Sequence, residues 1–138
     1  MVVYIYCTKG KNYYTGKIIG TFEVAKVEKI TDDNVSKFTK RSCLTEEELI
    51  NYLGRVNSKG VYSLKGYAIH IKNFNPWFTP EALKHRPPQN MMRYYKSDVL
   101  MSIKPKYCEL IKEGKKTIEI RRTVLKELEE IAEWIFLF

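Results

Sequence analysis

The chain has 138 residues, of which 44% are hydrophobic, so it is long enough to form one domain around a buried core. It contains no apolar run near the roughly 20 residues of a membrane-spanning helix, and its start lacks the pattern of a signal peptide, so we expect a cytoplasmic protein outside the membrane. The 24 Lys and Arg exceed the 16 Asp and Glu by a net charge of +8, which favours polyanionic partners, nucleic acid first among them.

The N-terminal segment reads as two strands joined by a basic loop. Residues 2–8 and 17–30 are rich in β-branched and aromatic types, which predicts strands. The loop at 9–16, KGKNYYTG, interleaves lysines with adjacent tyrosines. Bases stack on such rings and phosphates pair with such lysines, so this loop is a candidate contact for single-stranded nucleic acid. The alternative is a hairpin loop whose tyrosines lie down on the domain.

The middle of the chain contains one helix, one strand and a long irregular stretch. Thr45 and Glu48 form a capping box, which predicts a helix that ends before Gly54. The alternation in residues 67–72 predicts a strand with His70 on its solvated face, where the sequence shows no catalytic partner for it. Residues 73–97 contain four prolines and read as a long loop.

The most informative stretch is 99–122. Its apolar start predicts a strand, Pro105 opens a helix, and Gly114 ends that helix. In the strand that follows, Glu119 and Arg121 share one face with Thr117, because side chains alternate with period two. Residues 123–138 form an amphipathic pattern with an apolar tip, which predicts a helix that covers the domain or packs on a second chain.

The pattern Gly114-x-Lys116-x-x-Glu119-x-Arg121, preceded by SIKPKYCELIKEG, resembles the signature of the ASCH domain, the activating-signal-cointegrator homology family. That family has a PUA-like β-barrel. Its members usually open with this unit, whereas here the strands at 2–8 and 17–30 come first. The segment RPPQ at 86–89 resembles an element near the C-terminal end of phage and Firmicute members.

The resemblance therefore implies an α+β fold in circularly permuted order. We expect residues 1–122 to form a small PUA-like β-barrel with flanking helices, and residues 123–138 to add an extra C-terminal helix. A closed barrel with adjacent termini tolerates such a permutation.

The resemblance implies two kinds of function, RNA or nucleotide recognition and hydrolysis, because some relatives deacetylate a modified cytidine and some cleave RNA. The amidohydrolase members resemble this chain at Lys116, but they carry a threonine at the position of Glu119. Because Glu119 lies between two cations, we expect it to stay ionised. It then suits orienting Lys116 or accepting a hydrogen bond from a base, and the alternative is a salt-bridged corner that pins two strands.

Three hypotheses follow for the whole chain. The first is an RNA- or modified-nucleotide-binding protein that holds its ligand in a basic cleft through Lys116, Glu119 and Arg121. The second is a small hydrolase, a ribonuclease or N-acyl-cytidine amidohydrolase-like enzyme, with Lys116 and Glu119 as catalytic residues. The third is a phage-derived protein-interaction module that forms a homodimer or a domain-swapped dimer through residues 123–138.

The candidate ligand-binding residues in full are Lys9, Lys11, Tyr13, Tyr14, Arg86, Lys104, Gly114, Lys116, Glu119 and Arg121. The three cysteines form no C-x-x-C pair, and the sequence has no phosphate loop or dinucleotide fingerprint. We therefore expect neither a metal nor a cofactor.

Overall fold

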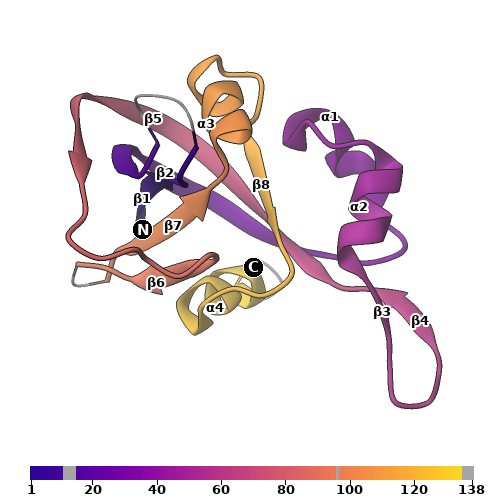
Figure 1. The fold of residues 1–138 in the computed structure, drawn as a ribbon. Coiled ribbons are helices and arrows are strands. Elements are labelled where there is room, and N and C mark those ends of the chain that lie inside the picture. Colours follow the sequence, from indigo (N-terminus) through magenta and orange to yellow (C-terminus); the bar gives the residue numbers. More distant parts are fainter. Residues whose placement is uncertain (11–14, 96, 135–138) are drawn as a thin grey trace. The chain divides into compact units, whose positions relative to one another are not determined.

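A computed structural model of the chain describes residues 1–10, 15–95 and 97–134, without the side chains of residues 133 and 134. The strands within these ranges are β1 (Val2–Cys7), β2 (Lys17–Ile30), β3 (Gly54–Val56), β4 (Tyr62–Leu64), β5 (Gly66–Ala82), β6 (Met91–Arg93), β7 (Val99–Ile103) and β8 (Ile118–Arg121) (Figure 1). The helices are the 3-10 helix η1 (Val35–Phe38) and the α-helices α1 (Thr39–Ser42), α2 (Glu46–Leu53), α3 (Pro105–Lys112) and α4 (Lys126–Trp134). The expected α+β class is thus confirmed.

The strands form a six-stranded sheet in the order β6-β7-β1-β2-β5-β8 and a separate β3-β4 pair. The chain divides into two compact units: unit 1 comprises Met1–Val24 and Ile71–Lys115, and unit 2 comprises Ala25–His70 and Lys116–Phe138. None of the helices in the described residues is long and apolar enough to cross a membrane.

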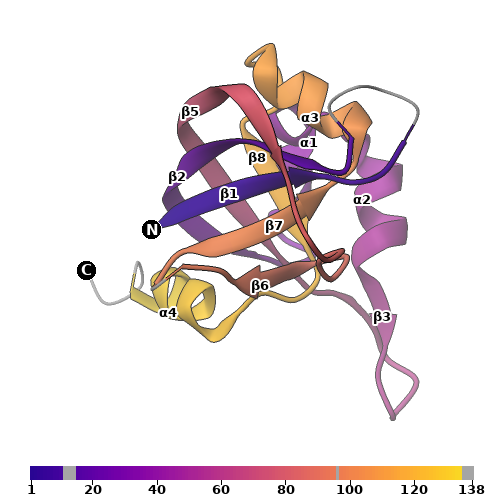
Figure 2. The ribbon, with the colours of Figure 1, turned by 60° about the vertical axis from the view of Figure 1, so that its left-hand side comes forward.

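Unit 1 is built around β1. This strand pairs antiparallel with β2 and parallel with β7, and β7 pairs antiparallel with β6. Figure 2 shows β1 between β2 and β7. Helix α3 begins at Pro105 and is followed by Gly114 at a φ of 75°, as the sequence predicts. Cys108 and Ile111 give this helix its buried side.

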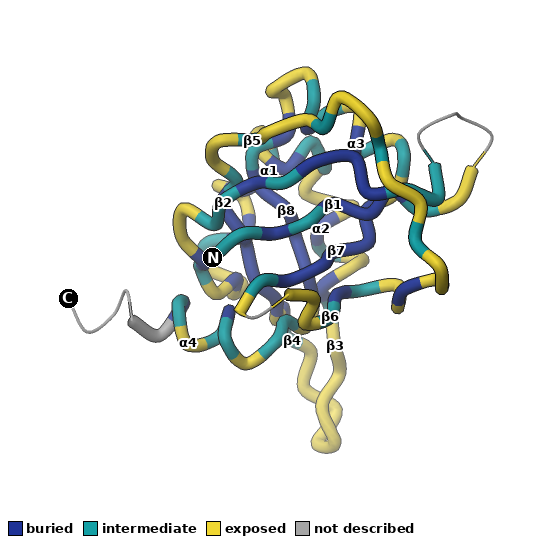
Figure 3. The backbone as a smooth tube through the Cα atoms, turned by 90° about the vertical axis from the view of Figure 1, so that its left-hand side faces the viewer, coloured by how far each residue is buried: buried dark blue, intermediate teal, exposed yellow. Residues whose placement is uncertain are grey.

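Unit 2 packs the helices η1 and α2 around one face of the antiparallel pair β5 and β8. Its core consists of Ile30, Val35, Phe38, Leu49, Leu53, Leu64, Ala68, Ile118 and Ile120. The predicted capping box is confirmed: Glu48 N donates to Thr45 Oγ1, and Thr45 N donates to Glu48 Oε1, each at 3.1 Å. Figure 3 shows β8 buried along its length and the β3-β4 hairpin exposed.

The prediction of a loop over residues 73–97 is wrong, because β5 continues to Ala82 and β6 occupies Met91–Arg93. The four prolines of this stretch indicated a loop, but proline is tolerated at strand positions whose N–H is not needed for pairing. The conformation and the burial of the strand nevertheless change at Asn73. Asn73 takes a left-handed φ of 52°, and the residues that follow it are exposed or half-buried.

Candidate functional site

Three charged side chains of unit 2 are buried just before β8 and along it. The exposed fractions are 1% for Lys116, 6% for Glu119 and 9% for Arg121. The segment that leads into β8 is tied to α1 by two hydrogen bonds: Thr117 N donates to the Arg41 carbonyl at 2.8 Å, and Arg41 Nε donates to Thr117 Oγ1 at 2.9 Å. These bonds fix the backbone next to Lys116 and so the point from which its side chain extends.

The side chains of Lys116, Glu119 and Arg121 are connected by ion pairs and together form an ion triad. Lys116 Nζ donates to the Ser42 carbonyl at 2.7 Å and lies 3.4 Å from Glu119 Oε1. Arg121 Nη2 donates to Glu119 Oε2 at 3.1 Å, and Ile120 N donates to Glu119 Oε1 at 3.1 Å. Both carboxylate oxygens of Glu119 are therefore engaged.

The environment of Glu119 keeps its carboxylate ionised. Burial raises the pKa of Glu119, but the neighbouring Arg121 and Lys116 charges and the hydrogen bonds from Arg121 and Ile120 outweigh it and hold the pKa below its usual value. The expectation of an ionised Glu119 is thus confirmed. An ionised carboxylate between two cations accepts hydrogen bonds well and is a weak general base.

A second polar cluster in unit 2 joins His70 to Glu28, with 2.9 Å between His70 Nε2 and Glu28 Oε2. The other oxygen, Glu28 Oε1, lies 3.3 Å from Lys37 Nζ and 3.5 Å from Lys26 Nζ. The ring of Phe38 meets the imidazole edge-on, with 6.4 Å between the ring centroids. The sequence showed no partner for His70 because Glu28 lies 42 positions earlier in the chain.

The prediction that His70 lies on a solvated face is wrong, since only 4% of this residue is exposed. The alternation in β5 was interpreted as one buried and one wet face. In the structure, His70 pairs with Ile118 of β8, on the face that also carries Ala68 and the core of unit 2. Whether His70 is buried depends on the helical segments that cover this face. The alternation of residue types within one strand does not show whether such a cover is present.

The His70–Glu28 contact predicts a loss of stability in mild acid. Burial lowers the pKa of His70 more than the hydrogen bond to Glu28 raises it, so the folded state takes up the proton at a lower pH than the unfolded chain, whose value is near 6.5. The free energy of unfolding should therefore fall as the pH drops below 6.5, by at most about 1.4 kcal/mol per pH unit from this group. Below 4.5, protonation of Glu28, whose pKa is lowered, should reduce it further.

Urea unfolding between about pH 7.5 and pH 5 measures this loss. The variant His70→Gln, which cannot titrate, should show a flatter dependence, and NMR titration of the wild type should place the His70 pKa below 6.5. A His70 pKa above 6.5 would contradict the prediction.

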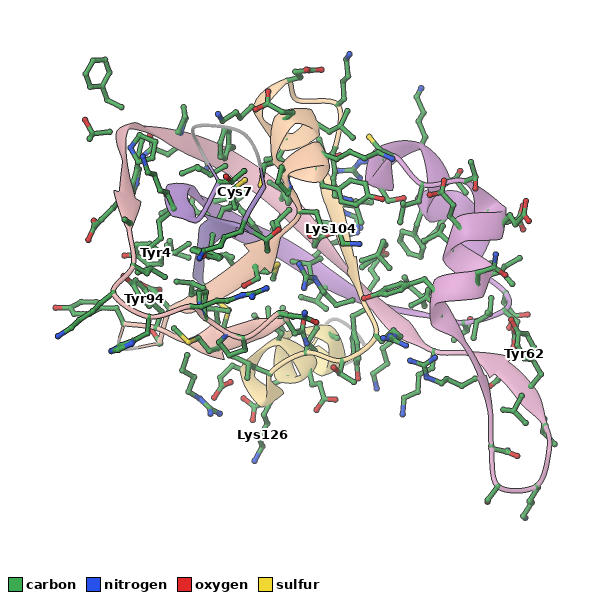
Figure 4. All side chains as sticks on the ribbon, in the orientation of Figure 1. Tyr4, Cys7, Tyr62, Tyr94, Lys104 and Lys126 are labelled. Atoms are coloured by element: carbon green, nitrogen blue, oxygen red, sulfur yellow. The ribbon has the colours of Figure 1, made fainter. Side chains whose placement is uncertain are left out.

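The structure brings together only part of the candidate ligand-binding set. Lys116, Glu119 and Arg121 meet in unit 2, whereas the other described candidates, Lys9, Arg86, Lys104 and Gly114, belong to unit 1 and are exposed. The side chain of Lys104 is labelled in Figure 4. The remaining candidates, Lys11, Tyr13 and Tyr14, lie outside the described residues.

Among residues 1–10, 15–95 and 97–134, no group of three or more His, Cys, Asp and Glu side chains is arranged to hold a metal ion. Comparisons of the chain with protein-family models, with curated proteins and with solved structures give no match.

Proposed function

We propose that this chain is an RNA- or modified-nucleotide-binding protein of the ASCH type, in which Glu119 and Arg121 contact the ligand and Lys116 positions Glu119. A PUA-like barrel in circularly permuted order is part of the same proposal. The observation that supports it is the ion triad, a buried carboxylate on β8 that is kept ionised by Arg121 on the same strand and by Lys116 just before it.

The energetics of burial favour a functional interpretation of the triad. Removing charges from water is expensive, and well-packed apolar residues of similar volume often give equal or greater stability. Titratable groups with shifted pKa values also cluster at functional sites. A triad that adds little stability therefore fits a site retained for recognition.

The chemistry of the two outer members suits a nucleotide. The Glu119 carboxylate accepts hydrogen bonds from a base amino group, and the Arg121 guanidinium binds phosphate through two parallel bonds. Their side chains keep exposed fractions of 8% and 11%, against 1% for Lys116. Lys116, bonded to the Ser42 carbonyl, thus acts as a positioning residue. The net charge of +8 adds a general attraction for phosphate.

The other two hypotheses have less support. In the hydrolase hypothesis, Lys116 would have to break its contacts with the Ser42 carbonyl and with Glu119 before it could react. The ionised Glu119 is in turn a weak general base. The third hypothesis assigns the C-terminal helix to a partner chain. Helix α4 already packs within unit 2, since Leu128 is buried and Tyr67 donates from its hydroxyl to Glu129 Oε1 at 2.9 Å.

The test is binding of a fluorescent single-stranded RNA of about 12 nucleotides at about 50 mM and about 200 mM salt. Wild type should bind with strong salt dependence and leave the RNA intact on a gel. Glu119→Gln and Arg121→Lys should each weaken binding about tenfold or more, because the first replaces a charged acceptor with a neutral one and the second removes one of the two parallel bonds to phosphate.

The matched control is Glu109→Gln, which removes an exposed carboxylate and should not weaken binding. Circular dichroism should show that every variant is folded. Absence of wild-type binding at the lower salt concentration would contradict the proposal. RNA cut by the wild type and left intact by Glu119→Gln would support the hydrolase instead.

A further inference from the structure

The positive charge of this protein is concentrated in unit 1. Its two segments contain twelve Lys and Arg against five Asp and Glu, a net charge of +7, whereas unit 2 contains twelve against eleven, a net charge of +1. The two values add up to the +8 of the whole chain. A polyanion that binds through long-range attraction therefore meets unit 1 as the basic part of the molecule.

Unit 1 also contains three aromatic rings in contact, called here the aromatic cluster: Tyr4, Trp77 and Tyr94. The centroids of the Tyr4 and Tyr94 rings are 5.0 Å apart, with planes tilted by 58°. The Tyr4 and Trp77 rings meet edge-on at 6.0 Å. Figure 4 shows the labelled side chains of Tyr4 and Tyr94 next to each other. The cluster unites β1, β5 and the residue after β6, so the sequence pattern of a single element does not reveal it.

The aromatic cluster is anchored on its inner side and open to solvent on its outer side. Tyr4 and Trp77 pack against a small apolar group formed by Tyr6, Ile18 and Leu100. The backbone of Tyr94 is fixed by a hydrogen bond from its N–H to the Asp98 carbonyl at 3.0 Å.

Tyr94 and two aromatic residues next to the cluster in the chain are exposed to solvent. The exposed fraction is 37% for Tyr94 and 61% for Tyr95, and Phe78, next to Trp77, is completely exposed. Large aromatic side chains in water lose the gain of burial, which a bound partner restores.

We propose that the aromatic cluster is a stacking surface for the bases of single-stranded RNA. This inference rests on the proposed function, since it takes RNA as the ligand, and it adds a second set of contacts in unit 1. Aromatic rings next to basic side chains are the common means of holding single strands, because each base offers a face for stacking and each phosphate a charge.

Basic residues follow the apolar anchors of the cluster in the chain. Leu83 and Met92 pack against the same apolar group, and each is followed directly by a basic residue, Lys84 and Arg93 respectively. Arg93 also directly precedes Tyr94 of the cluster, and the side chains of Lys84 and Arg93 are both exposed, as contact with a phosphate backbone requires. Single-stranded RNA thus fits this surface better than an apolar peptide does.

One carboxylate opposes this arrangement. Burial raises the pKa of the Tyr94 hydroxyl, and the negative charge of Glu81 contributes to the shift. Glu81 therefore lies close enough to act on the ring and should also repel an approaching phosphate. Removal of the Glu81 charge should therefore have the opposite effect to removal of a tyrosine ring: Glu81→Gln should strengthen RNA binding.

The experiment measures the affinity of the full chain for the same RNA of about 12 nucleotides at about 50 mM salt. We expect Tyr94→Ala and Tyr4→Leu to weaken binding by about 5- to 100-fold each, as loss of one stacked base predicts. Tyr94→Phe, which keeps the ring, should lose less affinity than Tyr94→Ala, and Glu81→Gln should bind more tightly. An RNA duplex should bind more weakly, because its bases are already stacked.

The control is Tyr62→Ala, which removes an exposed tyrosine from β4, a strand that carries neither the aromatic cluster nor the ion triad. Melting temperatures should show that Tyr94→Ala and Tyr4→Leu are folded at the temperature of the assay.

The outcomes separate the two proposals. If Glu119→Gln weakens binding and the Tyr4 and Tyr94 variants do not, the inference is wrong and the proposed site stands. If only the tyrosine variants weaken binding, the stacking surface is supported and the site at the ion triad is wrong. If the wild type binds no RNA, both are wrong.

Discussion

Replacement of Glu119 by leucine should lower the free energy of unfolding by about 3–5 kcal/mol, the usual effect of removing one partner from a buried ion pair. The variant takes away the carboxylate that Lys116 and Arg121 share, while both cations stay buried. A single domain is typically stable by about 5–15 kcal/mol, so this loss is a large part of the total. Guanidinium unfolding followed by circular dichroism measures it.

The matched control is Glu109→Leu. Glu109 is exposed, and its carboxylate lies 3.8 Å from Lys112 Nζ, a surface pair that contributes at most about 1 kcal/mol. If Glu119→Leu and Glu109→Leu have equal effects, the burial argument is wrong.

The triple variant Lys116→Met, Glu119→Leu, Arg121→Leu separates stability from function. It removes all three charges together, so it should recover most of the stability lost in Glu119→Leu. It should not recover RNA binding. Binding at the wild-type level by this variant would contradict the proposed function.

Truncation of Phe38 to alanine should cost about 3–5 kcal/mol, because the ring is 99% buried in the core of unit 2 and leaves a cavity. The same change should act on His70, whose imidazole meets the Phe38 ring edge-on. Water that enters the cavity reduces the desolvation of His70, so the His70 pKa should rise toward its ordinary value of 6.5. Denaturant unfolding and NMR titration measure the two effects.

Phe78→Ala is the control for this variant, because it removes the same ring from a completely exposed position. Its effect on stability should stay within about 0.5 kcal/mol. An equally small effect of Phe38→Ala would show that the ring is not part of a close-packed core.

Local signals in the sequence predict most of the elements. The strand expected at 17–30 has the same bounds as β2, and the capping box of α2, Pro105 at the start of α3 and Gly114 after its end are all confirmed. These features depend on backbone sterics and on hydrogen bonds within a few residues, which the sequence shows directly. The resemblance at 114–121 likewise identified the three charged residues that the structure brings together.

The prediction of a loop over residues 73–97 was wrong because it used local signals alone. Its prolines were weighed as local signals, but the tolerance of a strand for proline depends on whether its N–H faces a partner. That condition depends on the neighbouring strand, which the local sequence does not contain.

What the sequence by itself determined is therefore most of the helices and strands, the basic charge and the placement of Glu119 and Arg121 on one face of a strand. Only the tertiary structure decided that Lys116 reaches the carbonyl of Ser42, 74 positions away, and that His70 is buried beside Glu28. The contact between the rings of Tyr94 and Tyr4 likewise depends on the tertiary structure. The reason is physical: such contacts depend on which strands pair and which helices cover them, and residues far apart in the chain carry no local trace of that pairing.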